Sequence, residues 1–462
     1  MVRSEPVDAS TEFETHINKE ELRGYDVPPL SSYALPMQQP IYFMGIMSGT
    51  SADGIDVAIV EHSDEQPKLI HFSEYPIPEK LREPILRLAE PGIDEIDVMG
   101  ALDRALGKAF ADAANQSVEA SDIPAEQVIA IGSHGQTIRH RPKGMHGSHP
   151  FSLQIGCAAT IAEMTGITTV SDFRRRDIAA GGEGAPLVPF VHRELYGSSK
   201  SPVAILNIGG IANVTYIYNK SVLGFDTGPG NMIMDALMLS LSDGRNAYDE
   251  NGELAANGNI NEALLVELLN HPYLKRIPPK STGRETFGSD VVDKILSWPD
   301  MTDADRLATA TEFTARSIAE SLSFLPEPPD NWYLCGGGAL NGHLAKRLAE
   351  LLAPAEVSST HAINIPPEAM EAVCFALLTR NTLAGRSNTL PAVTGATHAV
   401  VGGEITPGNN WPGVLELVLK WTRSRTDEAA PFWRVAFQKR PFHIGMYGFW
   451  SSSPCFPTST IC

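Results

Sequence analysis

Two glycine-rich hairpins constrain the fold of this chain more than any other feature. Residues Met44–Val60 comprise an apolar strand, a turn of glycine and small polar residues, and a second apolar strand, and Ile205–Ile217 repeats this design roughly 160 residues later. Apolar runs on both sides of such a turn are typical of a β-hairpin. Chance is the plain alternative, because hairpins are common. The repeat favours two similar lobes that close over a nucleotide between them.

The turn of the first hairpin has the composition of a phosphate-binding loop. Its glycines allow backbone N–H groups to approach a bulky anion, and Thr50 and Ser51 add hydroxyl donors. Asp53 and Asp56 could face a magnesium ion or a water molecule. An ordinary glycine-rich turn is the alternative. The candidate nucleotide-binding residues of this turn are Gly49, Thr50, Ser51, Ala52, Asp53, Gly54, Ile55 and Asp56.

Strand-length apolar runs alternate with stretches of helical periodicity along most of the chain, which predicts an α/β fold. We expect residues 1–40 to form a poorly ordered extension, because they carry charge, proline and glutamine with little periodicity. Lobe I is predicted over 41–145 and is completed by 366–407, while lobe II is predicted over 146–365. Residues 408–462 lack the alternation and are expected to form a C-terminal tail.

Charge and composition limit the partners of the chain. Its 462 residues carry a formal net charge of −19, which argues against nucleic acid or an anionic membrane as a partner but not against a small anionic ligand. The five cysteines show no CxxC spacing, as expected for reduced thiols. There is no uninterrupted apolar run long enough for a membrane span, and the N-terminus is too acidic for a signal peptide. We expect a cytoplasmic protein.

Two further motifs follow predicted strands, at the position where ligands usually enter α/β sheets. In FDTGPGN the carboxylate of Asp226 could hold hydrated magnesium, although it could equally cap the next helix. GGGAL at Gly336–Leu340 could bind a phosphate or pass flat against a nucleobase. With the turn of the second hairpin, these motifs add the nucleotide-binding candidates Gly209, Gly210, Asp226, Gly228, Gly336, Gly337 and Gly338, of which Asp226 is also the candidate metal ligand.

The segment DFRRRD, at 172–177, offers two carboxylates with three arginines between them. A carboxylate held ionised beside a cation is a suitable general base for a hydroxyl group or a water molecule. We assign this role to Asp177, which borders the glycine loop AAGGEGAP, and expect Asp172 to anchor the turn. A solvated arginine face is the alternative for the cations.

Hydrogen-bonding side chains suited to a polyhydroxylated ligand occur in two further motifs. His134 and Gln136 belong to the motif SHGQT, and the loop KSTGRETF combines charges with hydroxyl groups. A buried structural histidine and a plain surface loop are the alternatives. The candidate substrate-binding residues are His134, Gln136, Arg174, Lys280, Arg284 and Glu371.

Several other chemistries are disfavoured. The chain has no GxxxxGK[ST] loop, no GxGxxG between a strand and a downstream acid, no HExxH or paired CxxC zinc motif, and no GxSxG. A P-loop enzyme, a Rossmann dinucleotide-binding protein, a zinc enzyme of these types and an α/β-hydrolase are therefore not expected.

Taken in order, the motifs resemble those of the anhydro-N-acetylmuramic acid kinase family. The segments that carry the resemblance are MSGTSADGID, SHGQTIRHRP, SLQIGCAATIAEMTGITTVSDFRRRDIAAGGEGAPLVP, NIGGIAN, FDTGPGN, PPKSTGRETF and CGGGALN. They run from about Ile41 to Pro407. That family belongs to the sugar kinase/heat-shock chaperone/actin superfamily, so the resemblance implies two related ribonuclease-H-like lobes with ATP and substrate in the cleft between them.

The resemblance also implies a reaction. A water molecule attacks C1 of a 1,6-anhydro sugar, the bridge opens, and the freed O6 takes the γ-phosphoryl group of ATP, with Mg²⁺ as cofactor. Asp177 matches the second aspartate of the family's DFRxxD motif and would activate the water. Gly49–Asp56 matches its ATP-binding loop. The expected partner is a small anhydro sugar, and a homodimer is allowed.

The chain departs from the family in places. Its N-terminal extension and the segment after Pro407 are not expected from the bacterial enzymes, and Glu183 stands where the family usually has glutamine. A charged glutamate at this position could alter the contacts with the sugar. Levoglucosan kinase is therefore an alternative, as is a sugar kinase that deprotonates a sugar hydroxyl with Asp177. A non-catalytic ATP-binding regulator would need neither Asp177 nor the KSTGRE loop.

Overall fold

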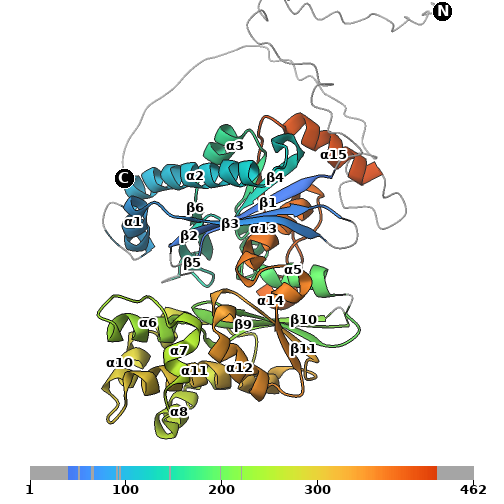
Figure 1. Ribbon diagram of the computed structural model, residues 1–462. Helices are drawn as coiled ribbons and strands as arrows, with labels where there is room; N and C mark the ends of the chain where they lie inside the picture. Colours follow the sequence, from blue (N-terminus) through green and yellow to red (C-terminus); the bar gives the residue numbers. More distant parts are fainter. Residues whose placement is uncertain are drawn as a thin grey trace, which may run out of the picture.

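The computed structural model describes residues 40–49, 52–63, 67–89, 92, 95–144, 147–197, 199–219 and 221–423. The expected N-terminal extension and most of the expected C-terminal tail lie outside these ranges. Within them the chain forms two lobes, each built on a mixed β-sheet, with helices on both faces of the sheets (Figure 1).

The sheet of lobe I has the order β13-β7-β4-β1-β2-β3. β1 pairs antiparallel with β2 and parallel with β4, β2 pairs antiparallel with β3, and β4 pairs parallel with β7. The short β13 closes the edge by antiparallel pairing with β7. These strands span β1 Tyr42–Met47, β2 Gly54–Glu61, β3 Lys68–Pro76, β4 Val128–Ser133, β7 Thr169–Ser171 and β13 Glu404–Thr406.

The sheet of lobe II repeats this plan with the order β10-β9-β8-β11-β12. Its first three strands form an antiparallel meander, and β8, β11 and β12 are parallel neighbours. The strands span β8 Val203–Ile208, β9 Ile211–Tyr218, β10 Ser221–Pro229, β11 Asn331–Cys335 and β12 Glu356–Ser359. The two hairpins predicted from the sequence, β1–β2 and β8–β9, thus occupy equivalent places in the two sheets. The expectation of an α/β fold with two related lobes is confirmed.

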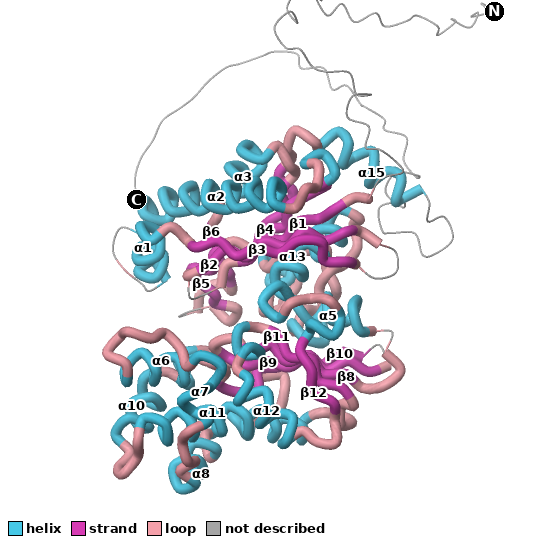
Figure 2. Tube along the Cα trace, viewed as in Figure 1, coloured by secondary structure: helices cyan, strands magenta, loops and turns pink. Residues whose placement is uncertain are grey.

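Helices cover the outer face of each sheet, and others lie between the lobes (Figure 2). On lobe I the outer helices are α1 Glu79–Ala89, α2 Glu95–Ala120 and α3 Ala158–Thr165. Between the sheets lie α5 Val188–Tyr196, α13 Met370–Leu383 and α14 Pro391–Thr394. The helices of lobe II are α6 Met232–Leu241, α7 Glu253–Ala256, α8 Glu262–Leu269, α9 Arg284–Phe287, α10 Ser289–Ser297, α11 Asp303–Glu320 and α12 Gly342–Leu351.

Shorter elements complete the two lobes. The hairpin of β5 Gln136–Arg141 and β6 Phe151–Ile155 forms a separate two-stranded sheet, α4 spans Arg175–Ala179, and α15 spans Trp411–Arg423. The 3₁₀ turns are η2 Ala125–Gln127, η3 Glu250–Gly252, η4 Pro272–Lys275, η5 Ser321–Phe324, η6 Gly337–Leu340, η7 Thr360–Ile363 and η8 Pro367–Ala369.

The apolar core has three layers, because alternate residues of a strand face opposite sides of its sheet. Tyr42, Met44 and Ile46 of β1 pack under the outer helices, while Phe43 faces the layer that contains α13. A Cβ at Gly45 would collide with the backbone of α13, so this glycine allows the helix to lie directly on β1. The middle layer, formed by α5 and α13 between the two sheets, joins the lobes through apolar contact.

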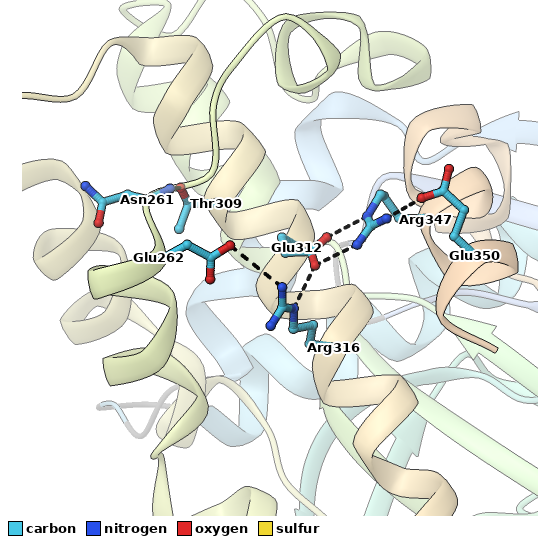
Figure 3. A network of polar contacts seen from close by, with 7 residues as sticks. All are labelled: Asn261, Glu262, Thr309, Glu312, Arg316, Arg347 and Glu350. Carbon is cyan, nitrogen blue, oxygen red and sulfur yellow. Dashed lines mark hydrogen bonds and ion pairs between the residues drawn. The ribbon is translucent and has the colours of Figure 1, made fainter. Parts of the chain in front are cut away.

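The buried carboxylate of Glu312 joins helices of lobe II to one another (Figure 3). Glu312 of α11 accepts hydrogen bonds from Arg316 of the same helix at 2.8 Å and from Arg347 of α12 at 2.8 and 2.9 Å. Arg316 also lies 3.8 Å from Glu262 of α8. Burial favours the neutral acid, but the two arginines outweigh it and hold the pKa of Glu312 below its ordinary value. α12, which follows the GGGAL motif, is thereby tied to α11 and, through α11, to α8.

The structure differs from the expected lobe boundaries at two places. β7 pairs with β4, so lobe I continues to at least Ser171, beyond the expected end at residue 145. At the other end, α15 packs on lobe I, where Trp421 lies 6.2 Å from Phe43 between ring centroids, so the fold extends past residue 407. Apolar periodicity identifies strands and helices but does not show which sheet they join.

Candidate active site

The candidate site residues follow the carboxyl ends of strands in both lobes. The glycine loop at residue 49 follows β1, His134 follows β4, Arg174 follows β7, and Gly336 follows β11. Parallel neighbours place their carboxyl ends at the same edge of a sheet, which is where α/β proteins bind ligands.

Asp177 lies on α4 and is fully buried. Its Oδ2 accepts a hydrogen bond of 2.8 Å from the backbone N–H of Gly184, and its Oδ1 accepts one of 2.8 Å from the hydroxyl of Thr394. A buried carboxylate costs free energy unless such donors satisfy it. The two bonds therefore fix the orientation of this carboxylate.

Gly184 links Asp177 to a second pair of side chains. Its carbonyl oxygen accepts a hydrogen bond of 2.9 Å from Arg174, whose other terminal nitrogen lies 2.7 Å from Nε2 of His134. Burial first and the Arg174 cation second lower the pKa of His134 well below its ordinary value, so the imidazole is neutral and Nε2 accepts from the guanidinium. Burial also lowers the pKa of Arg174 to about 10, an effect opposed by the carboxylate of Glu371.

Glu371, in the first turn of α13, connects the two lobes. Its Oε1 accepts a hydrogen bond of 3.2 Å from the side-chain amide of Asn207, near the end of β8. Burial raises the pKa of Glu371, while the Asn207 bond and the Arg174 charge oppose that shift. Arg174 and Glu371, both expected as substrate-binding residues, are thus electrostatic neighbours at the junction of the lobes.

Excess negative charge surrounds the first glycine loop. The pKa of Asp56 is raised to about 7 by burial first and then by the neighbouring carboxylates, which are those of Glu74, Glu371, Asp53 and Glu368. Carboxylate oxygens are the ligands that magnesium prefers. Among the residues that the structure describes, however, no three acidic, histidine or cysteine side chains are grouped as a metal site. A metal ion here would take oxygens from one or two carboxylates and the rest from phosphates and water.

Hydrogen bonds from the side chain of Gln136 hold the first glycine loop in place. The Gln136 amide accepts from the Ser48 hydroxyl at 2.8 Å and donates to the carbonyl of Gly49 at 3.0 Å, while Ser48 also donates to the carbonyl of Gly54 at 3.1 Å. Gln136 is buried, so its side chain supports this loop. Two predicted members of the loop, Thr50 and Ser51, lie outside the described residues.

The second glycine turn lies against two other predicted glycine segments. The carbonyl oxygens of Gly209 and Gly210 accept hydrogen bonds of 2.8 and 2.9 Å from the N–H groups of Asn231 and Gly230. A Cβ at Gly338 would collide with Ile208, and one at Gly336 would collide with Asn207, so the GGGAL loop crosses the end of β8 closely. Gly228 lies apart, within β10, where the absence of a side chain admits Ser317 of α11.

Asp226 is held by the segment that contains Lys280. Its Oδ2 accepts a hydrogen bond of 2.8 Å from the N–H of Thr282, and its own N–H donates to the carbonyl of Lys280 at 3.2 Å. The ammonium of Lys280, a predicted substrate-binding residue, is buried and donates to the carbonyl of Leu274 at 3.1 Å. Burial first and Arg276 second lower the pKa of Lys280 to about 8. The side chain of Arg284, the remaining sugar-binding candidate, lies outside the described part of the chain.

Sequence reasoning missed Thr394 and Asn207. Thr394 reaches Asp177 from 217 residues further along the chain, and Asn207 reaches Glu371 from the other lobe. Neither belongs to a pattern of local spacing that predicts its partner. The only signal was the position of Asn207 two residues before the glycines of the second hairpin.

Across the described ranges, no helix has the length and apolar character needed to cross a membrane.

Comparison with known proteins places these features in a family. A model of the family described as anhydro-N-acetylmuramic acid kinase matches residues 41–408. A protein of that name from Shewanella denitrificans is 46% identical over 371 residues, which cover 79% of this chain and 99% of the relative. One from Coxiella burnetii is 44% identical over 367 residues, covering 79% and 96%. A ROK family glucokinase from Streptomyces griseus, solved with glucose and AMPPNP, is 12% identical with a TM-score of 0.33 and covers 74% of this chain and 99% of its own.

The duplicated sheets, the glycine loops at their strand ends and the family match define a two-lobed α/β enzyme, a phosphotransferase with an alcohol group as acceptor. The chain belongs to the anhydro-N-acetylmuramic acid kinase family. The resemblance drawn from the ordered motifs of the sequence is thereby confirmed.

Proposed function

We propose that this protein is an ATP-dependent kinase that hydrolytically opens the 1,6-anhydro bridge of 1,6-anhydro-N-acetylmuramic acid and phosphorylates O6. The products are N-acetylmuramic acid 6-phosphate and ADP. The observation that carries the proposal is the buried carboxylate of Asp177, oriented by Gly184 and Thr394 in a chain about 45% identical to proteins of that name.

Asp177 acts as the general base. It accepts a proton from a water molecule, whose oxygen forms a bond to C1 of the sugar as the bond between C1 and O6 breaks. The freed O6 then forms a bond to the γ-phosphorus of ATP, and ADP leaves. Because both oxygens of Asp177 are held by donors, little reorganisation is needed when the proton moves.

Arg174, His134 and Glu371 orient the sugar. Gly184 forms hydrogen bonds with both Arg174 and Asp177, so the distance between the base and the cation is fixed. Because Nε2 of neutral His134 accepts from Arg174, its proton lies on Nδ1, which can donate to a sugar hydroxyl. Gln136 and Lys280 contribute through the loops that they hold.

The glycine loops of both lobes bind the nucleotide. Gly49 and its neighbours bind phosphate from lobe I, while Gly209, Gly210 and the GGGAL loop bind the nucleotide from lobe II. Asp226 is the proposed Mg²⁺ ligand, and the raised pKa of Asp56 indicates a surplus of negative charge that suits a divalent cation. When bound, Mg²⁺ neutralises phosphate charge. We further propose a cytoplasmic reaction on a small molecule, with no nucleic-acid partner.

The test is ADP release with 1,6-anhydro-N-acetylmuramic acid, levoglucosan and glucose, for the wild type and for Asp177→Asn. Turnover on the first sugar that the substitution abolishes supports the proposal. Turnover on levoglucosan alone transfers the same mechanism to a smaller sugar. Turnover on glucose alone would mean that Asp177 deprotonates a sugar hydroxyl, and nucleotide binding without any turnover would indicate a non-catalytic protein.

A further inference from the structure

Lys280 is the most completely enclosed lysine near the candidate site, and its surroundings differ from those of a ligand-binding cation. Its relative exposure is 5%. The ammonium lies 4.5 Å from the ring centroid of Phe324, 5.0 Å from that of Tyr273 and 5.7 Å from that of Phe225. Its amine donates to the carbonyl of Leu274 at 3.1 Å. Three aromatic faces and a carbonyl form an internal site for this cation.

The residues that enclose Lys280 also hold Asp226. Phe225 precedes Asp226 in β10, and the Tyr273 hydroxyl donates to the carbonyl of Asp226 at 2.9 Å. The Asp226 N–H donates to the carbonyl of Lys280 at 3.2 Å, and the Thr282 N–H donates to Oδ2 of Asp226 at 2.8 Å. Three hydrogen bonds therefore join Asp226 to residues 273–282, two donated by this segment and one donated by Asp226, and the Lys280 ammonium holds the segment against β10.

We propose that Lys280 is a positioning residue, whose caged ammonium fastens residues 273–282 so that the Thr282 amide fixes the carboxylate of Asp226. The inference rests on the proposed function only in giving Asp226 a role toward the Mg²⁺–nucleotide complex. Lys280 itself touches neither sugar nor phosphate. The cation acts because an ammonium facing three rings and a carbonyl resists movement, whereas an apolar side chain would lose the electrostatic part of that contact.

Lys280→Met tests the proposal because methionine preserves the unbranched stem and removes the charge. Lys275→Met is the matched control, since Lys275 belongs to the same segment but is exposed, and its amine donates to the side-chain oxygen of Asn270 at 3.2 Å. Two readouts decide between the roles. One is hydrogen exchange of the peptide that contains the Thr282 amide, without any ligand, and the other is the affinity for Mg²⁺–AMPPNP without sugar.

We expect Lys280→Met to accelerate exchange at Thr282 and to weaken Mg²⁺–AMPPNP binding about tenfold, the effect of losing one charge-assisted contact. The KM for the sugar should stay unchanged while kcat falls, and Lys275→Met should match the wild type throughout. Unchanged exchange and nucleotide affinity with a raised sugar KM would overturn the proposal, because Lys280 would then contact the sugar.

Phe324→Leu provides a second route if Lys280→Met does not fold. It removes the nearest wall of the cage and retains Lys280, and it should shift both readouts in the same direction by a smaller factor. Wild-type exchange and affinity in this variant would contradict the proposal. Since the exchange readout needs neither nucleotide nor sugar, a wild type without turnover would refute the proposed function while still deciding the role of Lys280.

Discussion

The hydroxyl of Thr394 donates a hydrogen bond of 2.8 Å to Oδ1 of Asp177, across 217 residues of sequence. Asp177 lies on α4, which follows a strand of lobe I, whereas Thr394 ends α14, which packs against β10 of lobe II. The carbonyl of Thr394 in turn accepts a hydrogen bond of 2.8 Å from the N–H of Glu183, so α14 is bound to the loop that follows α4. The proposed base is therefore oriented by one donor close to it in sequence and by one from the layer between the sheets.

Asp177→Asn should abolish most turnover while the protein remains folded. The amide has nearly the same shape but cannot accept a proton at neutral pH, so we expect kcat to fall about 10²–10⁴-fold. Nucleotide affinity, measured by calorimetry, should change little and serves as the control. Retained turnover would show that another group activates the water.

Thr394→Val should lower kcat about tenfold, because one of the two donors that orient Asp177 is lost while the side-chain volume is kept. Thr394→Ser is the matched control, since it retains the hydroxyl and should stay close to the wild type. Steady-state kinetics of both variants decide the matter. A loss in Thr394→Ser but not in Thr394→Val would point to packing of the threonine methyl group instead.

Asp56→Asn should stabilise the protein increasingly as the pH rises. Burial and neighbouring carboxylates raise the folded-state pKa of Asp56 to about 7, so its contribution to stability is present at low pH and is lost as the pH rises through that value. Above pH 7 the neutral amide should raise the free energy of unfolding by about 1–3 kcal/mol, a range reduced for partial exposure.

Urea unfolding in EDTA at pH 5, 6, 7 and 8 measures this gain without bound metal. It should grow up to about pH 7 and then level off. A gain that is independent of pH would mean that charge at Asp56 does not limit stability.

Asn410→Ala should destabilise lobe I by about 2–4 kcal/mol, since its side chain forms several partly buried hydrogen bonds. Its amide oxygen accepts from the N–H and the hydroxyl of Thr168 at 2.8 and 2.7 Å, and its NH₂ donates to the carbonyl of Ile129 at 3.0 Å. Exposed Asn409 is the control position, where alanine should have little effect. Thermal melting of the two variants compares them, and similar midpoints would contradict the prediction.

Glu183→Gln should leave the sugar KM unchanged. The carboxylate of Glu183 lies 3.6 Å from the Lys143 ammonium, and the side chains are 39% and 78% exposed, so the pair contributes less than about 1 kcal/mol. The difference in the free energy of unfolding between Glu183→Gln and the wild type should become smaller still in 0.5 M salt, which screens the pair. A large change in KM would show instead that Glu183 contacts the sugar.

Local patterns predicted much of the fold. The turns after β1, β8 and β11 were identified because glycine and apolar runs mark strand ends wherever they occur. The pairing of β7 with β4 and the docking of α15 were not predicted, since apolar runs do not specify their partners. The site shows the same division. Asp177 was predicted from its neighbours in sequence, the arginines and the glycine loop. The contact of Thr394 with Asp177 and the aromatic cage of Lys280 could not be predicted in this way, because they depend on long-range contacts.

The positions of the strands along the chain also affect the order in which the two lobes fold during synthesis. All five strands of the lobe II sheet come from the continuous segment 203–359, whereas the lobe I sheet needs β13 at Glu404–Thr406 and its inner face needs α13. As the chain leaves the ribosome, lobe II has every strand available while lobe I still lacks its covering helix and its edge strand. Since domains fold as units during synthesis, the sheet of the second lobe can form before that of the first. The apolar inner face of the lobe I sheet then waits, uncovered, for the last part of the chain, which makes the nascent protein most vulnerable to aggregation at that stage.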